Sequence, residues 1–163
     1  AIVECGRSYL SHPLQIRILL ALRVLATQQM SREVEASSRR CLVKYVRLFE
    51  DRTGESHVED VEEQLSRADF APPAPPLNIS AALPVLQMIF LSVPTGWEGD
   101  WHPSPVRQFI FVVAGELELE ASDGEVRQFR TGDVAFAEDV SGKGHCSRAI
   151  GDEVFSAVIV QLE

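Results

Sequence analysis

The sequence predicts an all-β sandwich or barrel over residues 41–163, and three observations indicate this fold class. First, nine short strand-like runs separated by turn residues fill that part of the chain. Second, Leu and Glu alternate over residues 116–120, which places apolar and charged side chains on opposite faces of a strand. Third, Asp123 and Gly124 separate two of the runs, and this pair is typical of a tight hairpin because it tolerates positive φ.

The predicted strands follow one another along the chain. They lie at residues 41–49, 57–65, 84–93, 107–114, 116–121, 125–130, 133–138, 144–150 and 153–162. Apolar residues at every position of 109–113 predict a strand that is covered on both faces. Proline has no N–H group for a sheet ladder, so the segment APPAPP at 71–76 is expected to be an extended polyproline strap or an edge segment.

Residues 13–38 favour a helix instead. Pro13 suits a first helical turn, and good helix formers follow with no further Gly or Pro before Gly54. The apolar residues spread around most of the helical wheel, so this helix needs a partner surface in its own domain or in another chain. The alternative is a basic targeting arm or an upstream extension that is not integral to the fold. We therefore expect a helical, basic extension at 1–40 and one β domain at 41–163.

Charge and hydropathy exclude several classes of partner. The net charge is −9 at pH 7, and the acids gather in the β domain, which disfavours nucleic acid because phosphate binding needs Lys and Arg. Arg17 and Arg23 interrupt the most apolar stretch, so it provides neither the roughly 20 apolar residues of a membrane span nor the core of a secretory signal. Three widely spaced cysteines without a CxxC pair favour a reducing compartment, and we expect a cytoplasmic location.

One stretch of the β domain resembles the first motif of the cupin family, a family of small jelly-roll barrels. That motif runs G, five residues, HxH, three or four residues, E, six residues, G. Here the frame is occupied in order by Gly96, His102, Ser104, Gln108 and Gly115. Ser104 stands where the family has its second histidine and Gln108 where it has its glutamate.

A second stretch resembles the other cupin motif, which runs G, five residues, PxG, two residues, H, three residues, N. The match begins at Gly132 and includes His145, which lies two places later than in the family pattern. Glu138 replaces the proline and Ala149 the asparagine. The resemblance covers about residues 77–162, and it implies a cupin-like double-stranded β-helix, or jelly roll, that follows the N-terminal helical extension.

The resemblance implies a site inside the barrel, where His102, Gln108 and His145 would hold a divalent metal ion such as Zn, Fe, Mn, Ni or Cu. A non-haem iron site normally takes two histidines and a carboxylate, whereas two imidazoles with an amide or water suit Zn, Cu or Ni. His102 and His145 are also the candidate catalytic residues. The alternative for each is a histidine that simply hydrogen-bonds the backbone. A buried Gln108 amide must find partners or cost about 1–3 kcal/mol.

Three further residues are candidates for ligand binding. Trp101 is expected to form an aromatic wall, although packing at the barrel rim is an equal alternative. Asp139 and Lys143 belong to a charged, glycine-containing loop that leads to His145, and such loops often carry function. They would polarise a substrate or pair with one another, and a solvated surface turn is the alternative.

Three functions remain open. The β domain binds a small polar molecule as an enzyme that uses His102 and His145 with a divalent metal; or it is a metal-free enzyme similar to sugar isomerases and epimerases; or it is a non-catalytic ligand-binding, sensing or structural dimeric cupin. We also expect a homodimer, because the long apolar strands at 84–93 and 153–162 would be hazardous if left uncovered. The extension at 1–40 is the alternative cover.

Overall fold

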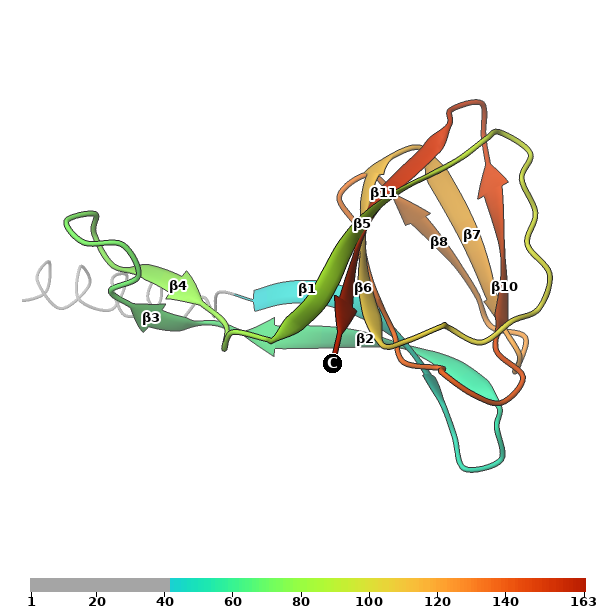
Figure 1. The fold of residues 1–163 in the computed structure, drawn as a ribbon, viewed down its shortest axis with the longest axis horizontal. Helices are drawn as coiled ribbons and strands as arrows, with labels where there is room; N and C mark the ends of the chain where they lie inside the picture. The colour runs from blue at the N-terminus through green and yellow to red at the C-terminus, as the bar shows by residue number, and fades with distance from the viewer. Residues whose placement is uncertain (1–41) are drawn as a thin grey trace, which may run out of the picture. The chain divides into compact units, whose positions relative to one another are not determined.

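The computed structural model describes residues 42–163, which form an all-β domain, as the sequence predicts (Figure 1). The helix expected at residues 13–38 lies outside the described residues. Within the described part of the chain, no helix is long and apolar enough to cross a membrane. Eleven strands follow one another in residues 42–163. They are β1 (Leu42–Glu50), β2 (Ser56–Gln64), β3 (Ser66–Ala68), β4 (Leu77–Ile79), β5 (Val85–Val93), β6 (Gln108–Ala114), β7 (Glu116–Ala121), β8 (Val126–Arg130), β9 (Val134–Ala137), β10 (His145–Ile150) and β11 (Phe155–Leu162).

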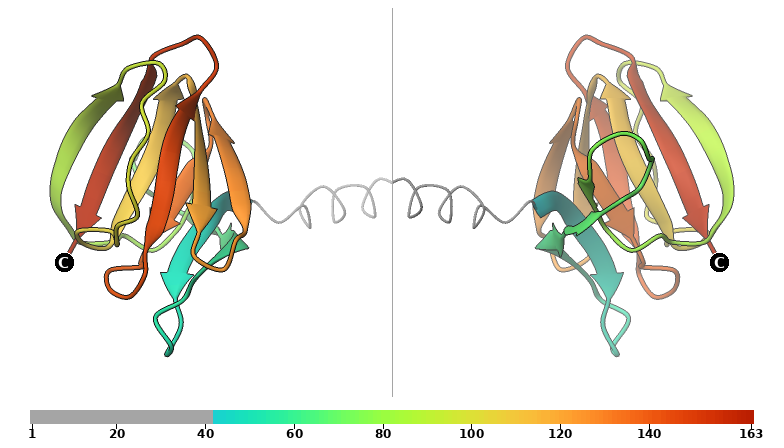
Figure 2. Two further views of the ribbon diagram at one scale, coloured as in Figure 1. Left: turned by 90° about the vertical axis from the view of Figure 1, so that its right-hand side faces the viewer. Right: turned by 90° about the vertical axis from the view of Figure 1, so that its left-hand side faces the viewer.

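Two sheets face each other across the core, and a third, small sheet is appended. The larger sheet has the strand order β2-β1-β9-β6-β11-β5, and the smaller has β10-β7-β8. Strands β3 and β4 form the appended hairpin. Only β1 and β9 pair in parallel among the described strands. Figure 2 shows the three strands of the smaller sheet nearest the viewer on the left and the strands of the larger sheet on the right.

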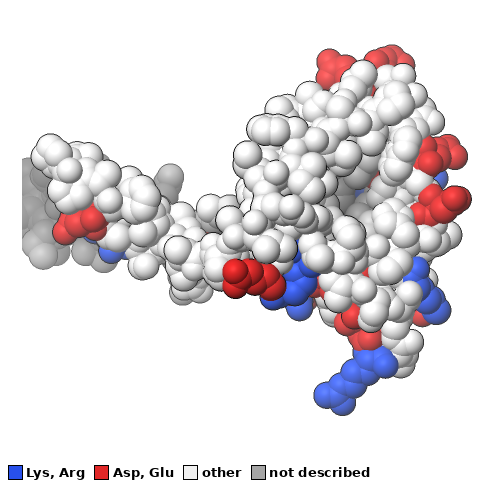
Figure 3. All heavy atoms as spheres, in the orientation of Figure 1, with Lys and Arg blue, Asp and Glu red and all other residues white. Residues whose placement is uncertain are grey.

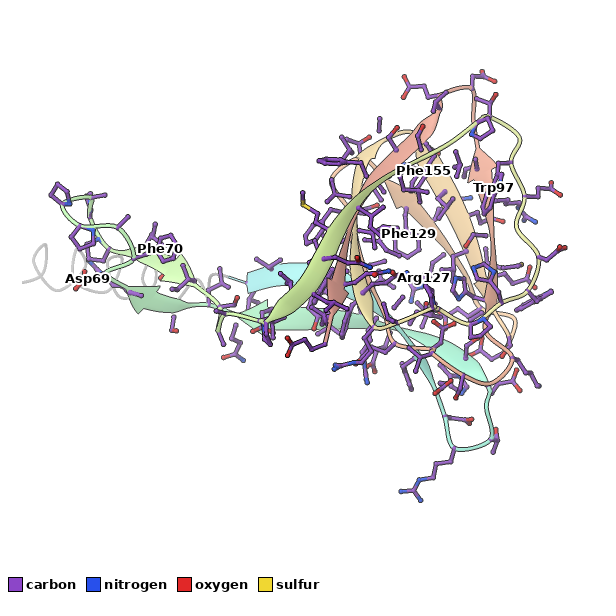
Figure 4. All side chains as sticks on the ribbon, viewed as in Figure 1. Asp69, Phe70, Trp97, Arg127, Phe129 and Phe155 are labelled. Carbon is purple, nitrogen blue, oxygen red and sulfur yellow. The ribbon has the colours of Figure 1, made fainter. Side chains whose placement is uncertain are left out.

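Side chains from both sheets fill the core. The alternation predicted for β7 is confirmed, since Leu119 is buried and Leu117 packs against the core cluster. Phe155 of β11 and Phe129 of β8 come from opposite sheets, and both are almost fully buried (Figure 4). The remaining members of the cluster are small or branched apolar residues, which lets the sheets approach closely. This packed interior fixes the positions of the strands that carry the candidate site residues.

The predicted hairpin at Asp123 and Gly124 is confirmed. Gly124 has φ +90°, which a residue with a side chain rarely adopts. Its N–H donates to the carbonyl of Ala121 at 2.9 Å, and the Ala121 N–H donates to Glu125 at 2.9 Å. The turn therefore joins β7 to β8 in the register that puts Leu119 into the core.

Two expectations are wrong in an informative way. Residues 71–76 are not an extended strap but the loop between β3 and β4, in which Ala74 donates to Ala71 at 3.0 Å (Figure 4 labels Asp69 and Phe70 beside this loop). The prolines do lie outside any ladder, as their missing N–H requires. Strand β6 is not covered on both faces within the described residues, since Phe111 is 40% and Val113 55% exposed. Its apolar outer face is open.

An ion-pair cluster joins the turn after β1 to the turn after β7. The Nδ1 atom of His57 lies 2.6 Å from Asp123 Oδ2, and its Nε2 atom lies 3.4 Å from Asp51 Oδ2. The hydrogen bond to Asp123, and to a smaller extent the one to Asp51, raises the pKa of His57. The stabilisation of the folded state is thus fully present below the unfolded pKa and is lost as the pH rises through the raised folded value.

We expect His57→Gln to lower the free energy of unfolding at about pH 5.5 by about 0.2–1 kcal/mol, the range of exposed ion pairs, and to leave it nearly unchanged at about pH 9. Urea unfolding of the wild-type chain and the variant at both pH values measures this difference. An equal loss at both pH values would show that the imidazole acts through packing, for example on Phe49, and not through its charge.

Candidate functional site

A cavity of about 50 Å³ lies between the two sheets. A single water needs about 10–15 Å³ on the same measure, so the cavity holds a few waters or part of a small molecule. Most of its wall is apolar and comes from both sheets, with Ile110, Leu119 and Phe129 as examples. Its polar lining residues are His102, Ser104, Gln108 and His145. An apolar cavity with a few convergent polar groups is the usual form of a small-molecule site.

The backbone brings His102 and His145 together. His102 lies in the loop before β6, and His145 is the first residue of β10. The two residues form an isolated antiparallel bridge, in which each N–H donates to the other's carbonyl at 3.0 Å. Their ring centroids are 4.8 Å apart. The loop and the strand therefore hold two imidazoles side by side at the cavity.

Asp139 lies behind His145 and fixes its ring. The Nδ1 atom of His145 is 2.6 Å from Asp139 Oδ2, and the Ser104 hydroxyl donates to Asp139 Oδ1 at 2.8 Å. Asp139 is fully buried, and Ser104 also donates its backbone N–H to the Asp139 carbonyl at 2.9 Å. Because an ionised carboxylate only accepts hydrogen bonds, the Nδ1 atom of His145 carries a proton. The Nε2 atom of His145 is left free for another partner.

His102 also has its Nδ1 atom hydrogen-bonded and its Nε2 atom free, but its acceptor is a backbone carbonyl. Its Nδ1 atom lies 2.7 Å from the backbone carbonyl of Asp100, and a carbonyl only accepts. Within residues 42–163 neither the Nε2 atom of His102 nor that of His145 has a hydrogen-bond partner. His102 does hydrogen-bond the backbone, as the alternative interpretation of this residue expects. Its ring nevertheless also lines the cavity. His102 is exposed whereas His145 is buried, so the pair spans the cavity mouth.

Gln108 belongs to a ladder of three side-chain amides across β5, β11 and β6. Gln87 Nε2 donates to Gln161 Oε1 at 2.5 Å, and Gln161 Nε2 donates to Gln108 Oε1 at 3.1 Å. These three residues stand opposite one another in the sheet register. The buried amide therefore has a partner, and the amide nitrogen of Gln108 is the group left to face a ligand.

Trp101 and Lys143 do not line the cavity. Trp101 is 50% exposed, and Lys143 forms an ion pair with Glu55. The other tryptophan, Trp97, packs against the core cluster, and Figure 4 labels it close to β10. Asp139 is brought to the site, but its carboxylate is turned to His145 and Ser104 and is closed to solvent. Its position makes it a positioning residue for the imidazole.

The donor set does not fit a tightly held divalent ion. Catalytic zinc sites take three protein ligands, and iron sites require a carboxylate among them. Within residues 42–163 no three His, Cys, Asp or Glu side chains gather in a way that could hold a metal. The oxygen of Gln108 already accepts from Gln161, which leaves two imidazoles. The metal role of His102, Gln108 and His145 therefore stays a prediction, and two imidazoles alone would bind an ion weakly.

The architecture is that of a small all-β barrel with a cavity between its two sheets. The family model for the cupin domain (Cupin_2) matches residues 89–161, which run from β5 to β11. Residues 89–161, which lie within the β domain, thus match the cupin domain family, in agreement with the resemblance of the two sequence motifs. No curated protein matches the chain.

Several solved cupin structures are similar to the chain. A cupin 2 conserved barrel domain protein from Salinispora arenicola has 23% identity and a TM-score of 0.41, with 62% of this chain and 76% of that chain covered. An RmlC-like cupin family protein from Methanocaldococcus jannaschii has 16% identity and a TM-score of 0.41, with 58% and 86% covered. The Cnp3 cupin domain of Schizosaccharomyces pombe has 11% identity and a TM-score of 0.41, with 66% and 79% covered.

Proposed function

We propose that the β domain binds a small polar molecule in the barrel cavity and that His102 and His145 exchange a proton with it without a resident metal ion. One observation carries the proposal: each imidazole has its Nδ1 atom engaged, by Asp139 or by the Asp100 carbonyl, and leaves its Nε2 atom without a partner. Imidazole accepts and releases protons near neutral pH, so it is the usual general acid or base.

The arrangement favours proton removal from a carbon beside a carbonyl group. His145 is the better base of the two, because the Asp139 carboxylate behind it stabilises the imidazolium that forms when the Nε2 atom takes a proton. The amide nitrogen of Gln108 is placed to donate to an oxygen of the ligand. The His145 imidazolium can return that proton to the neighbouring carbon, and the free Nε2 atom of His102 lies next to it as a second proton acceptor. The net charge of −9 disfavours anionic ligands at long range, so a neutral hydroxy-carbonyl compound fits best.

Deuterium exchange tests this proposal with dihydroxyacetone and glyceraldehyde as probes. The full chain, dialysed against a chelator, is mixed with each probe in D₂O, and the proton signal beside the carbonyl is followed by NMR. We expect that signal to fade faster than in buffer alone, and the enhancement to fall by about 10²–10⁴ in His145→Ala, the usual contribution of a general base.

Three results would speak against the proposal. Exchange that disappears on chelation and returns with zinc would show that a metal carries the chemistry. Exchange that survives His145→Ala would place the reaction elsewhere. Probe binding without exchange, seen as shifts of the histidine ¹⁵N resonances, would favour the non-catalytic ligand-binding cupin.

A further inference from the structure

A groove of about 450 Å³ lies outside the barrel cavity, and we call it the edge groove. It is lined by β1, β2, β8 and the start of β9. Strand β8 is the outermost strand of the smaller sheet, as the left-hand view of Figure 2 shows, and β2 is the outermost strand of the larger sheet. At one end Ser56 and Ser122 join them, each N–H donating to the other's hydroxyl at 2.8 and 2.7 Å. Farther along, Arg127 of β8 lies 3.7 Å from Asp60 of β2. The edge groove therefore opens where the two sheets are not hydrogen-bonded to each other.

Strand β8 turns backbone hydrogen-bonding groups toward this groove. Bonded and non-bonded residue pairs alternate along two antiparallel strands, and the bond that closes the β7–β8 hairpin determines which pairs are bonded. The backbone groups of Val126, Gln128 and Arg130 consequently face away from β7. Those of Arg130 are engaged, because its N–H donates to Asp133 Oδ2 at 2.7 Å and its carbonyl accepts from the Asp133 N–H at 2.9 Å. In the described part of the chain no strand pairs with the groups of Val126 and Gln128 on this side.

The edge groove has an apolar part and a backbone part. Val46 of β1 and Phe129 of β8 supply apolar surface, and Figure 4 labels Phe129 above Arg127. The side chain of Gln128 donates to Glu118 Oε2 at 3.0 Å on the outer side of the smaller sheet, so Gln128 lines the groove with its main chain. A strand laid along β8 would send alternate side chains toward Val46 and Phe129. The groove volume lies within the range of about 300–1,000 Å³ that is usual for ligand sites.

The charges around the edge groove favour a basic occupant. Lys44 is paired with Glu62 at 2.9 Å, and Arg127 is paired with Glu125 on its own strand at 2.8 Å. Asp60 has only the longer contact of 3.7 Å with Arg127, and its side chain is 74% exposed. Its carboxylate is therefore the least neutralised acid of the lining. The charged lining residues are three acids and two bases: Asp60, Glu62, Asp133, Lys44 and Arg127.

We propose that the edge groove binds an extended, basic peptide segment of another protein as an added strand on β8. The main chain of the peptide pairs with Val126 and Gln128. One of its apolar side chains packs on Val46 and Phe129, and a lysine or arginine beside it pairs with Asp60. In this mode of recognition the main-chain hydrogen bonds give affinity and the contacts of alternate side chains give specificity. The net charge of −9 attracts a basic segment at long range.

Fluorescence anisotropy with the full-length chain tests the proposal. The probe is a short, labelled peptide of alternating lysine and valine with blocked ends, and we expect a dissociation constant in the micromolar range. A glutamate–valine peptide of the same length should bind at least about tenfold more weakly. The lysine–valine peptide with every backbone nitrogen methylated should do the same, because it keeps its charge but cannot donate to a strand edge. Hydrogen exchange of the Val126 and Gln128 amides should slow when the unmethylated peptide is added.

Asp60→Lys tests the charged wall of the groove. We expect it to weaken binding of the lysine–valine peptide by about tenfold or more, since an attraction becomes a repulsion. Glu153→Lys is the matched control, because it changes the net charge equally but lies in the turn between β10 and β11, which does not line the groove. Figure 3 shows acidic side chains at this turn, at the top of the view. That variant should bind within about threefold of the wild type.

Three results would overturn the proposal. The lysine–valine peptide does not bind the wild-type chain; or the methylated peptide binds equally well, which would indicate attraction by surface charge without strand pairing; or Asp60→Lys binds the peptide as Glu153→Lys does. Circular dichroism reports whether the variants fold, and the hydrogen-exchange measurement on the wild type decides the matter if Asp60→Lys does not. Deuterium exchange of the carbonyl probes should be unchanged in Asp60→Lys, which separates this proposal from the proposed function.

Discussion

Gly144→Ala is expected to break the bridge between His102 and His145 and to lower the free energy of unfolding by roughly 3–5 kcal/mol. A Cβ atom at position 144 would lie 2.2 Å from the backbone carbon and oxygen of His102 and 2.4 Å from the nitrogen of Pro103. Those atoms are backbone and cannot turn aside. Gly144 also has φ +71°, a conformation that costs other residues about 1–2 kcal/mol.

The substitution acts on the site as well as on stability. Gly144 directly precedes His145. A shift of the backbone at position 144 therefore breaks the two N–H···O bonds of 3.0 Å that pair the histidines. The two imidazole rings are then no longer held 4.8 Å apart at the cavity. The rate of the proposed proton transfer should therefore fall to the rate in buffer alone. Urea unfolding measures the stability, and histidine ¹⁵N spectra report the change at the rings.

Gly151→Ala is the matched control. Gly151 has φ +78°, yet a Cβ atom there would meet nothing within 4 Å. That variant therefore isolates the backbone strain from the clash, and it should cost only about 1–2 kcal/mol. If the two substitutions destabilise the chain equally, the close approach of position 144 to the His102 loop is not what holds the site together.

The strands of the fold could be predicted because their signals are local. Alternating leucines in β7 and the turn at Gly124 specify which side chains are buried and where the chain reverses, with no knowledge of distant residues. The apolar run of β6 is different. An uninterrupted apolar strand predicts cover on both faces, but the pattern does not say what provides the cover, and the described chain covers only the inner face. Sequence alone therefore cannot separate a strand buried within its own domain from one buried against a partner.

The site could be predicted only in part, because local sequence patterns do not reveal contacts between distant residues. The two motifs single out the imidazoles, and four of the residues they mark, His102, Ser104, Gln108 and His145, do line one cavity. The roles of Asp139 and Ser104 depend on a contact between residues 35 positions apart, which no local pattern reveals. Charge and a glycine-containing loop suggest that Asp139 meets the ligand, whereas the fold turns it inward to hold a histidine. Lys143 has the same signal and is instead paired at the surface with Glu55.

Asp139→Asn is expected to abolish most of the proposed proton transfer while the chain still folds. The carboxylate accepts hydrogen bonds from Ser104 and from the Nδ1 atom of His145, whereas the asparagine amide has one oxygen to accept with. If the amide nitrogen faces His145, it donates to the Nδ1 atom and shifts the ring proton to the Nε2 atom, which can then no longer act as a base. Even if the oxygen faces the ring, no negative charge stabilises the imidazolium.

We expect the deuterium-exchange rate of Asp139→Asn to fall by about 10²–10⁴, as for the loss of a general base, and the free energy of unfolding to fall by about 1–3 kcal/mol because a buried hydrogen bond is lost. The ¹⁵N shifts of His145 show which ring nitrogen carries the proton, a readout that a purely structural role would not change. Ser104→Ala removes one hydrogen bond but keeps the charge, so it should slow exchange by no more than about tenfold and cost about 1 kcal/mol.

Asp123→Asn provides the matched control, because Asp123 holds His57 at the same 2.6 Å in a pair away from the cavity. It should leave the exchange rate unchanged. An Asp139→Asn chain that loses stability but exchanges deuterium within about threefold of the wild type would contradict the assignment, since a base depending on this carboxylate loses far more. In that case only His102 would assist His145 in proton transfer, and Asp139 would serve to stabilise the fold.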